Sequence, residues 1–177
     1  AYPGVGATGA TRGRRGGVSA LVAVLALPLA GALMAVALPD RAARAAALAA
    51  IAATLAAAIS LAASVVLQGL PRLEVGGWSP PVGIVLEADG LSVALIVMTA
   101  LVMAGAGLSA RHGLAQSAAG ERIAFGFWPL MLLLWAALNA VFLSRDLFNL
   151  YVGIELLSLA AVGLVAIEGK ADAIAAA

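Results

Sequence analysis

Five long apolar stretches constrain the fold of this chain more than any other feature of its sequence. A helix needs about 20 predominantly apolar residues to cross a hydrocarbon core of about 30 Å. Composition points the same way, because 64% of the residues are hydrophobic and 11% are charged, far from the balance of a soluble domain. We therefore predict an all-α integral membrane protein with about five transmembrane helices. The predicted spans cover residues 18–38, 45–67, 90–110, 125–144 and 147–167.

The first span has an alternative interpretation as a secretory signal. The letters "RGRRGG" precede an apolar run, and Ala35, Val36 and Ala37 imitate an A-x-A cleavage site. The apolar region of a signal has about 7 to 15 residues, whereas this uncharged run extends from Gly16 to Pro39 and four further spans follow it. A membrane span is therefore the preferred interpretation.

The segments outside the spans contain the glycines, prolines and charges that end helices. Residues 1–17 are Gly-rich and polar, so we expect a disordered tail. Between the second and third spans, the alternation in "LEVGGW" favours a hairpin. Trp78 and Trp128 are typical of a membrane interface, and Pro129 is typical of a first helical turn. The final "ADAIAAA" resembles the start of another helix, so we expect a piece of a longer chain, truncated before a sixth helix.

The Lys and Arg residues in alternate loops predict which side of the membrane each loop occupies. The set of loops that contains more Lys and Arg residues is the one after the first and third spans. This count places those loops in the cytoplasm and the N-terminus outside. The tail arginines then lie outside and make the two counts equal. The cytoplasmic group is Arg41, Arg44, Arg111, Arg122 and Lys170, and the opposite group is Arg72 and Arg145 with Arg12, Arg14 and Arg15 of the tail.

Several function classes find no support in the composition. A net charge of +1 and 5% aromatic residues provide neither the basic surface nor the stacking platforms of a nucleic-acid-binding protein. The chain has no cysteine and a single histidine, His112, so we expect no metal site. No phosphate-binding pattern of the form G-x-x-x-x-G-K-[ST] occurs, and we expect no cofactor.

One carboxylate, Glu155, lies in the middle of the fifth span. Counted from Leu147 at 1.5 Å per residue, it lies roughly 12 Å into the core, too deep for its short side chain to reach either interface. An ionised acid at such a depth costs on the order of 3 kcal/mol, so Glu155 must be protonated, partnered or hydrated. Intramembrane acids commonly mark ion or proton pathways, and we therefore predict that Glu155 transfers protons.

Two structural interpretations of Glu155 stay open beside that prediction. The acid could be neutral and only hydrogen-bond between helices, or the span could be displaced along its axis. A displacement is unattractive because Arg145 and Asp146 mark one boundary of the span, and Glu168 and Lys170 mark the other. Sliding the helix would immerse one of those charged pairs.

Other polar residues suggest subsidiary roles. Tyr151 and Ser158 lie within one helical turn of Glu155 and could hold water or relay a proton. Asn139, in the fourth span, is expected to form an interhelical hydrogen bond, and lining a water path is the alternative. Asp146 and Asp89 precede spans and are expected to cap them. Small residues in the fifth span allow close helix contact, namely Gly153, Ala160, Ala161 and Gly163.

The stretch "SRDLFNLYVGIELLSLAAVGLVA" resembles the fifth helix of the antiporter-like family, which includes the proton-pumping subunits of complex I and the D-type subunits of Mrp-type multisubunit cation/proton antiporters. Its signature is an Asp-Leu-Phe-Asn run followed by a helix with one glutamate. A second stretch, "GGWSPPVGIVLEADGLSVALIVM", is similar to the segment that leads into the third helix and leans toward the Mrp branch. The resemblance extends over residues 18–177. The matching residues are Asp146, Leu147, Phe148, Asn149 and Glu155, and upstream Gly77, Trp78, Pro81, Gly83, Ile84, Asp89, Leu91 and Ser92.

In that family a subunit has about fourteen helices, and the fifth-helix glutamate pairs with a lysine on the seventh in a unit with discontinuous helices. The resemblance implies that Glu155 is the proton-handling acid. No residue of this sequence matches the lysine, and Lys170 is not a substitute because it lies beyond the fifth span. Arg145 departs from the family, whose members often have a small or neutral residue there.

The resemblance implies a proton-conducting membrane subunit of a multisubunit antiporter, a transporter and not an enzyme in its own right. The expected partners are other subunits, the lipid bilayer, H⁺, and Na⁺ or another monovalent cation, in a bacterial inner membrane. One alternative is a proton-pumping subunit of NADH-quinone oxidoreductase or a membrane hydrogenase. Another is a non-transporting scaffold, if the chain naturally ends at residue 177.

Overall fold

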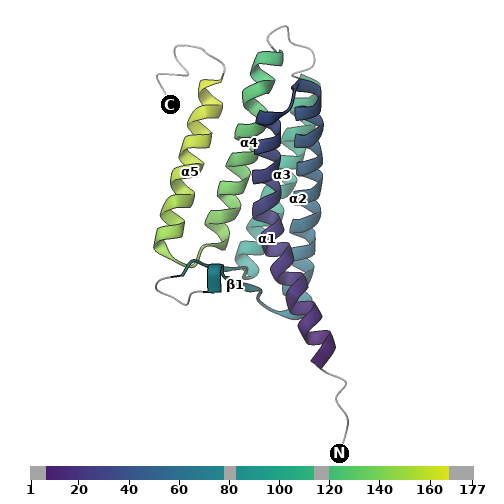
Figure 1. The fold of residues 1–177 in the computed structure, drawn as a ribbon, viewed down its shortest axis with the longest axis vertical. Coiled ribbons are helices and arrows are strands. Elements are labelled where there is room, and N and C mark those ends of the chain that lie inside the picture. The colour runs from purple at the N-terminus through teal and green to yellow at the C-terminus, as the bar shows by residue number, and fades with distance from the viewer. Residues whose placement is uncertain (1–6, 78–82, 114–119, 168–177) are drawn as a thin grey trace, which may run out of the picture.

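The structure is a computed structural model that describes residues 7–77, 83–113 and 120–167. Over these ranges it consists of five α-helices, with a small antiparallel hairpin between the second and third (Figure 1). Consecutive helices run in opposite directions, so their ends gather at two levels. The elements are α1 (Ala7–Ala37), α2 (Asp40–Gln68), β1 (Arg72–Glu74), the 3₁₀ turn η1 (Val75–Gly77), β2 (Val85–Glu87), α3 (Gly90–Gly113), α4 (Gly120–Leu143) and α5 (Leu147–Ala166).

Each of the five helices is long and apolar enough to cross a membrane. The helical segments that meet this criterion agree with the predicted spans to within four residues, the largest difference being a start at Arg41 where 45 was predicted. Agreement is close because a span is defined by the length of an uncharged run, which is a local property of the sequence. The prediction of an all-α membrane protein with five spans is confirmed.

The N-terminal tail differs from the prediction. Helix α1 begins at Ala7, so residues 7–17, which we expected to be disordered, form its first three turns. Adding a residue to an existing helix gains one hydrogen bond for one residue ordered, whereas a new helix must first form a costly nucleus. The apolar span that follows supplies the nucleus, and the polar segment extends it.

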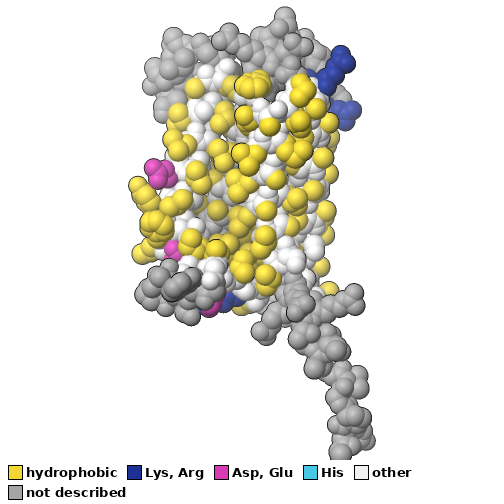
Figure 2. Space-filling view, viewed as in Figure 1, with side chains coloured by type: hydrophobic (Ala, Val, Ile, Leu, Met, Phe, Trp, Pro, Cys, Tyr) yellow, Lys and Arg dark blue, Asp and Glu magenta, His cyan; other side chains and the backbone are white. Residues whose placement is uncertain are grey.

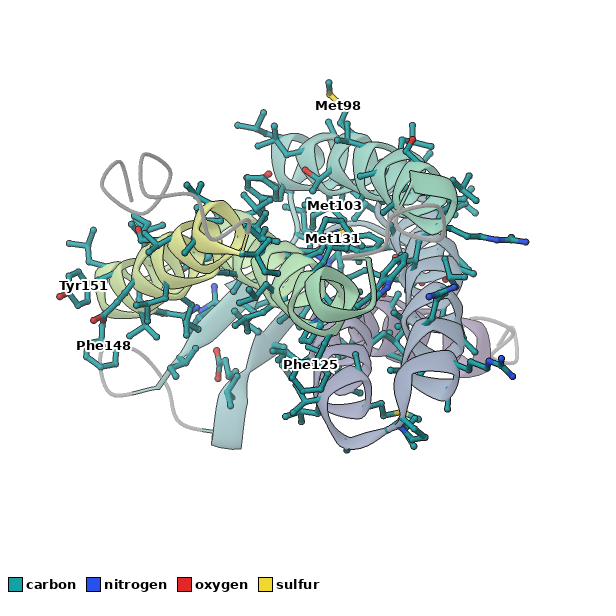
Figure 3. The ribbon with its side chains drawn as sticks, turned by 90° about the horizontal axis from the view of Figure 1, so that it is seen from above. Met98, Met103, Phe125, Met131, Phe148 and Tyr151 are labelled. Atoms are coloured by element: carbon teal, nitrogen blue, oxygen red, sulfur yellow. The ribbon has the colours of Figure 1, made fainter. Side chains whose placement is uncertain are left out.

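Helices α1 to α4 form the bundle that contains most of the buried side chains. Small residues bring α1 and α2 together, since a Cβ atom added at Gly31 would collide with the Cβ atom of Ala50 and lie 3.1 Å from Leu132 Cδ1. Met103 and Met131 point into the bundle, whereas Met98 points away from it (Figure 3). Helix α5 lies outside this bundle and packs mainly against α4.

One of two predictions for the start of the fourth span is wrong. Trp128, which was expected at the membrane interface, is the fourth residue of the apolar span that begins at Phe125. Its side chain is buried, with its ring packed edge to face on Phe127 at a centroid distance of 5.4 Å, and its interfacial position stays a prediction. Pro129 lies well inside α4 and not in its first turn, because the helix already begins at Gly120. The polar segment before the span therefore continues the helix. Trp78 lies outside the described residues.

The hairpin between α2 and α3 is present, but its second strand lies farther along the chain than "LEVGGW". Strand β1 pairs with β2 in antiparallel register, with Leu73 opposite Leu86. Gly76 has a φ of 75°, a left-handed conformation that glycine adopts without strain, and it turns the chain after β1. Residues 75–77 therefore form a turn, and the pairing partner comes from "VLE" at 85–87.

Candidate functional site

Helix α5 begins at a local capping motif. The Asp146 carboxylate accepts a hydrogen bond from the Asn149 backbone amide at 2.7 Å, and Ser144 Oγ donates to the Asp146 carbonyl at 3.0 Å. A side-chain oxygen at the N-cap satisfies one of the four amides that have no partner within the helix. The predicted capping role of Asp146 is confirmed, and the "DLFN" letters set where α5 begins.

Two glycines hold α5 against α4. A Cβ atom added at Gly153 would lie 2.9 Å from Val141 Cγ2, and one added at Gly163 would lie 2.9 Å from Leu130 Cδ2. Ala160 is buried between them. Close backbone approach through small residues is the usual way in which helices associate in lipid, where burying apolar surface provides no driving force. The face of α5 that carries the small residues is thereby directed at α4.

The opposite face of α5 is exposed and carries Glu155. The acid is the ninth residue of the 20-residue helix, close to its midpoint. Its side chain is exposed, and no hydrogen bond or ion pair joins it to another residue within 7–77, 83–113 and 120–167. Figure 2 shows acidic side chains interrupting the hydrophobic surface on the α5 side. Exposed apolar residues surround Glu155 on this flank, among them Tyr151, Ile154, Leu159 and Val162.

The other predicted site residues on α5 share its exposed side. Phe148 and Tyr151 project away from the bundle in Figure 3. The Ser158 hydroxyl is also exposed, but it donates to the Ile154 carbonyl of its own helix at 2.9 Å and not to Glu155. Tyr151, Glu155 and Ser158 thus lie along one flank of α5, and neither hydroxyl is hydrogen-bonded to the acid within the described residues.

Asn139 is not brought to Glu155. It is fully buried in the α1–α4 bundle, where its Nδ2 donates to the Val24 carbonyl of α1 at 2.8 Å. The predicted interhelical hydrogen bond is therefore present. Because this contact directs the Asn139 side chain at α1 and Glu155 lies on the exposed flank of α5, the two residues belong to different parts of the molecule.

An ion-pair cluster joins the hairpin to the entrance of α5. Arg145 Nη2 lies 2.5 Å from Glu87 Oε1 and 3.7 Å from Asp89 Oδ2, and its backbone amide donates to the Val85 carbonyl at 3.2 Å. The hydrogen bond to Glu87 raises the pKa of Arg145 further above its usual value. Sequence reasoning missed this contact because Glu87 and Arg145 are 58 residues apart and no local pattern links them.

Asp89 has two roles in the same cluster. Its Oδ1 accepts from the Ser92 amide at 2.8 Å, which confirms the predicted N-cap of α3. Hydrogen bonds from Ser92 lower the pKa of Asp89, and the nearby Arg145 guanidinium adds to the effect. A charged Asp89 thus stabilises the start of α3 and faces Arg145 at the start of α5.

We expect Arg145→Gln to destabilise the folded protein more than Arg72→Gln does. The two arginines are matched in side-chain exposure, at 46% and 49%, but Arg72 pairs within the hairpin whereas Arg145 connects the hairpin to α5. Isolated exposed ion pairs contribute little, so the difference reports the connection between elements. Thermal unfolding in lipid nanodiscs measures it, and an equal or larger loss for Arg72→Gln would contradict the role assigned to Arg145.

A cavity in the described part of the chain lies away from Glu155. It has a volume of about 350 Å³ and opens at the hairpin end between α1 and α2, where Gly17, Ser64, Gln68, Pro71 and Arg72 contribute to its lining. No group of three or more His, Cys, Asp or Glu side chains in the described ranges could hold a metal ion. Glu155 stays the candidate site because of its position near the middle of α5.

Comparisons with curated proteins identify relatives over most of the chain. It is 34% identical over 115 residues to the D subunit of a Na(+)/H(+) antiporter of Alkalihalophilus pseudofirmus, covering 65% of this chain and 22% of the relative. It is 40% identical over 126 residues to the N subunit of NADH-quinone oxidoreductase of Desulforudis audaxviator, covering 67% and 23%. It is 31% identical over 160 residues to the antiporter subunit mnhD2 of Staphylococcus haemolyticus, covering 89% and 31%.

The chain thus spans between about a fifth and a third of the length of these curated relatives. No protein-family model matches it. The relatives carry the names of both branches that the "DLFN" and "GGW" motifs indicated. The chain is a homologue of the antiporter-like membrane subunits found in Mrp-type cation/proton antiporters and in NADH-quinone oxidoreductase.

Proposed function

We propose that this chain is a proton-conducting membrane subunit of a multisubunit monovalent cation/proton antiporter, with Glu155 as its intramembrane proton-transfer acid. The observation that carries the proposal is the position of Glu155 at the middle of a membrane-spanning helix. An ionisable side chain in the middle of a membrane span is energetically unfavourable. Such residues usually form part of a proton or ion pathway. The similarity to the D-type subunits of Na⁺/H⁺ antiporters supports the transport class.

The proposed mechanism uses the exposed flank of α5. Glu155 alternates between a protonated state and a state paired with a cationic side chain of another transmembrane element. Since α4 supports the opposite face of α5, the flank that carries Glu155, Tyr151 and Ser158 is free to receive that element. Movement of the cation changes which charge state of Glu155 is stable, so proton uptake and release follow the movement. Tyr151 and Ser158 contribute hydroxyl groups that hold water beside the acid.

The partners and location follow from the same proposal. The chain works in a bacterial inner membrane, with lipid around its apolar faces and other subunits of the complex beside it. Its transported ions are H⁺ and Na⁺ or another monovalent cation. The hairpin end, where both arginines of the described loops are paired with acids, lies outside, and the end with Arg41, Arg44 and Arg111 lies in the cytoplasm.

A second function is favoured by one observation, the 40% identity to a subunit of NADH-quinone oxidoreductase. In that case electron transfer in a neighbouring subunit drives proton movement through the same acid. A non-transporting scaffold is the third possibility, and it requires no titrating acid.

Everted membrane vesicles that contain the native complex separate these functions. For the antiporter, we expect added Na⁺ or K⁺ to dissipate an imposed pH gradient without any electron donor. The redox-driven function predicts proton uptake only when electrons are supplied and no response to the cation. A complex that assembles with this chain but moves protons under neither condition would be evidence for the scaffold.

A further inference from the structure

Helix α1 contains a proline in its buried interior. Pro28 has no backbone N–H, so the Val24 carbonyl, four residues earlier, loses the hydrogen bond that continues an α-helix. Val24 and Pro28 are both fully buried in the bundle. Burial keeps water from this carbonyl, and an unpaired carbonyl in an apolar environment is costly.

A side chain from another helix supplies the missing donor. Asn139 Nδ2 of α4 donates to the Val24 carbonyl at 2.8 Å, across a sequence separation of 115 residues. Asn139 is itself fully buried, and its Oδ1 has no hydrogen-bond partner in the part of the chain that the structure describes. The Asn139 side chain is therefore oriented so that its Nδ2 forms a hydrogen bond and its Oδ1 does not. A leucine at this position would remove the unpaired Oδ1 but would leave the Val24 carbonyl without a donor.

The two halves of α1 are held by different contacts. Beyond the proline, Gly31 lies so close to Ala50 of α2 and Leu132 of α4 that an added Cβ atom would meet both. Before the proline, Gly17 lies close to Ser64 of α2, and the bond from Asn139 joins the Val24 carbonyl to α4. A helix that lacks a ladder hydrogen bond can bend at that point. The bond from α4 therefore limits how far the first half can bend away from the second.

We propose that Pro28, Val24 and Asn139 form a latched hinge in α1, in which Asn139 is a positioning residue that fixes the angle between the two halves of the helix. The hydrogen bond from Asn139 also joins α1 to α4, and α5 packs mainly against α4. The inference concerns the α1–α4 bundle and does not depend on proton transfer by Glu155, so either one can fail while the other stands.

A double-mutant cycle tests the hinge in the full-length protein in lipid nanodiscs. Asn139→Leu alone is expected to lower the melting temperature by about 2–4 °C, the usual response of a domain of this size to the loss of one buried interaction. Pro28→Ala restores a backbone donor to the Val24 carbonyl. In that background the loss caused by Asn139→Leu is expected to shrink to half or less. Equal losses in both backgrounds would overturn the proposal.

Thr54→Val is the matched control. Thr54 is also fully buried and polar, but its Oγ1 donates to the Ala50 carbonyl of its own helix at 2.7 Å. The fall in melting temperature caused by Thr54→Val is expected to be the same in the Pro28→Ala background as in the unmodified protein. If Asn139→Leu fails to accumulate, the Pro28→Ala double variant is expected to accumulate. A double variant that fails while Pro28→Ala alone accumulates would also overturn the proposal.

A distance measurement reports the hinge itself. The chain has no cysteine, so nitroxide labels can be placed on introduced cysteines at the exposed positions Val22 of α1 and Leu101 of α3. Asn139→Leu is expected to broaden the distribution of distances between the labels, and adding Pro28→Ala is expected to narrow it again. A general loosening of the bundle would broaden the distribution in Thr54→Val as well. An unchanged distribution in Asn139→Leu would contradict the latch.

Discussion

Glu155→Gln in the full-length protein is expected to reduce proton-coupled transport to background while the complex still assembles. Glutamine keeps the size and hydrogen-bonding capacity of a protonated glutamate but cannot release a proton. A positioned acid or base contributes about 10² to 10⁴ in proton-transfer steps, so the loss should reach at least about two orders of magnitude. Everted vesicles loaded with a pH indicator measure the initial rate of cation-dependent proton movement.

Glu74→Gln is the control for this experiment. It makes the same chemical change in β1, outside the membrane spans, at a side chain that is 39% exposed and contacts Arg72. We expect it to leave the transport rate close to that of the unmodified protein. Undiminished transport by an assembled Glu155→Gln complex would reject Glu155 as the proton-transfer acid, and the fold and family assignment would be unaffected.

Gly153→Val is expected to detach α5 from α4. The new Cβ atom would lie 2.9 Å from Val141 Cγ2. Because valine is β-branched and has few rotamers available in a helix, either the Val141 side chain or α5 itself must shift. Overpacking of this kind costs about 1–3 kcal/mol. The expected result is a fall in melting temperature of several degrees and, because α5 carries Glu155, a loss of transport in the same variant.

Gly105→Val provides the matched control for Gly153. Gly105 lies inside α3, and an added Cβ atom there would meet nothing within 4 Å. The two substitutions share the effect of placing a β-branched residue in a helix. The difference between them therefore measures the contact of α5 with α4. Similar falls in melting temperature for both variants would show that this contact contributes little.

Much of the fold could be predicted because it depends on short-range patterns. Apolar runs locate the spans, and acids just before Gly90 and Leu147 mark the helix starts that Asp89 and Asp146 cap. The wrong predictions occur where a neighbouring element overrides the local pattern. Residues 7–17 extend the helix of the first span, and Pro129 lies inside α4 because that helix begins earlier than its apolar run.

The candidate site could likewise be predicted only in part. Its depth in the membrane follows from counting residues along one helix, so the sequence by itself determined that Glu155 lies near the middle of α5. The direction in which that side chain faces depends on how α5 is rotated against α4, and this rotation is decided by contacts at Gly153 and Gly163. Hydrophobicity alone does not specify this rotation because apolar residues occur on all sides of α5.

The sequence alone therefore determined that this is a membrane protein, where the stretches long and apolar enough to span a bilayer lie along the chain, and that one of them holds an acid near its middle. Only the tertiary structure decided the partners of Asn139 and Arg145, which lie 115 and 58 residues away from them along the chain. Local hydrogen bonding and hydrophobic length act within one helix. Pairing between distant residues depends on how the helices pack, and that information is distributed over the whole bundle.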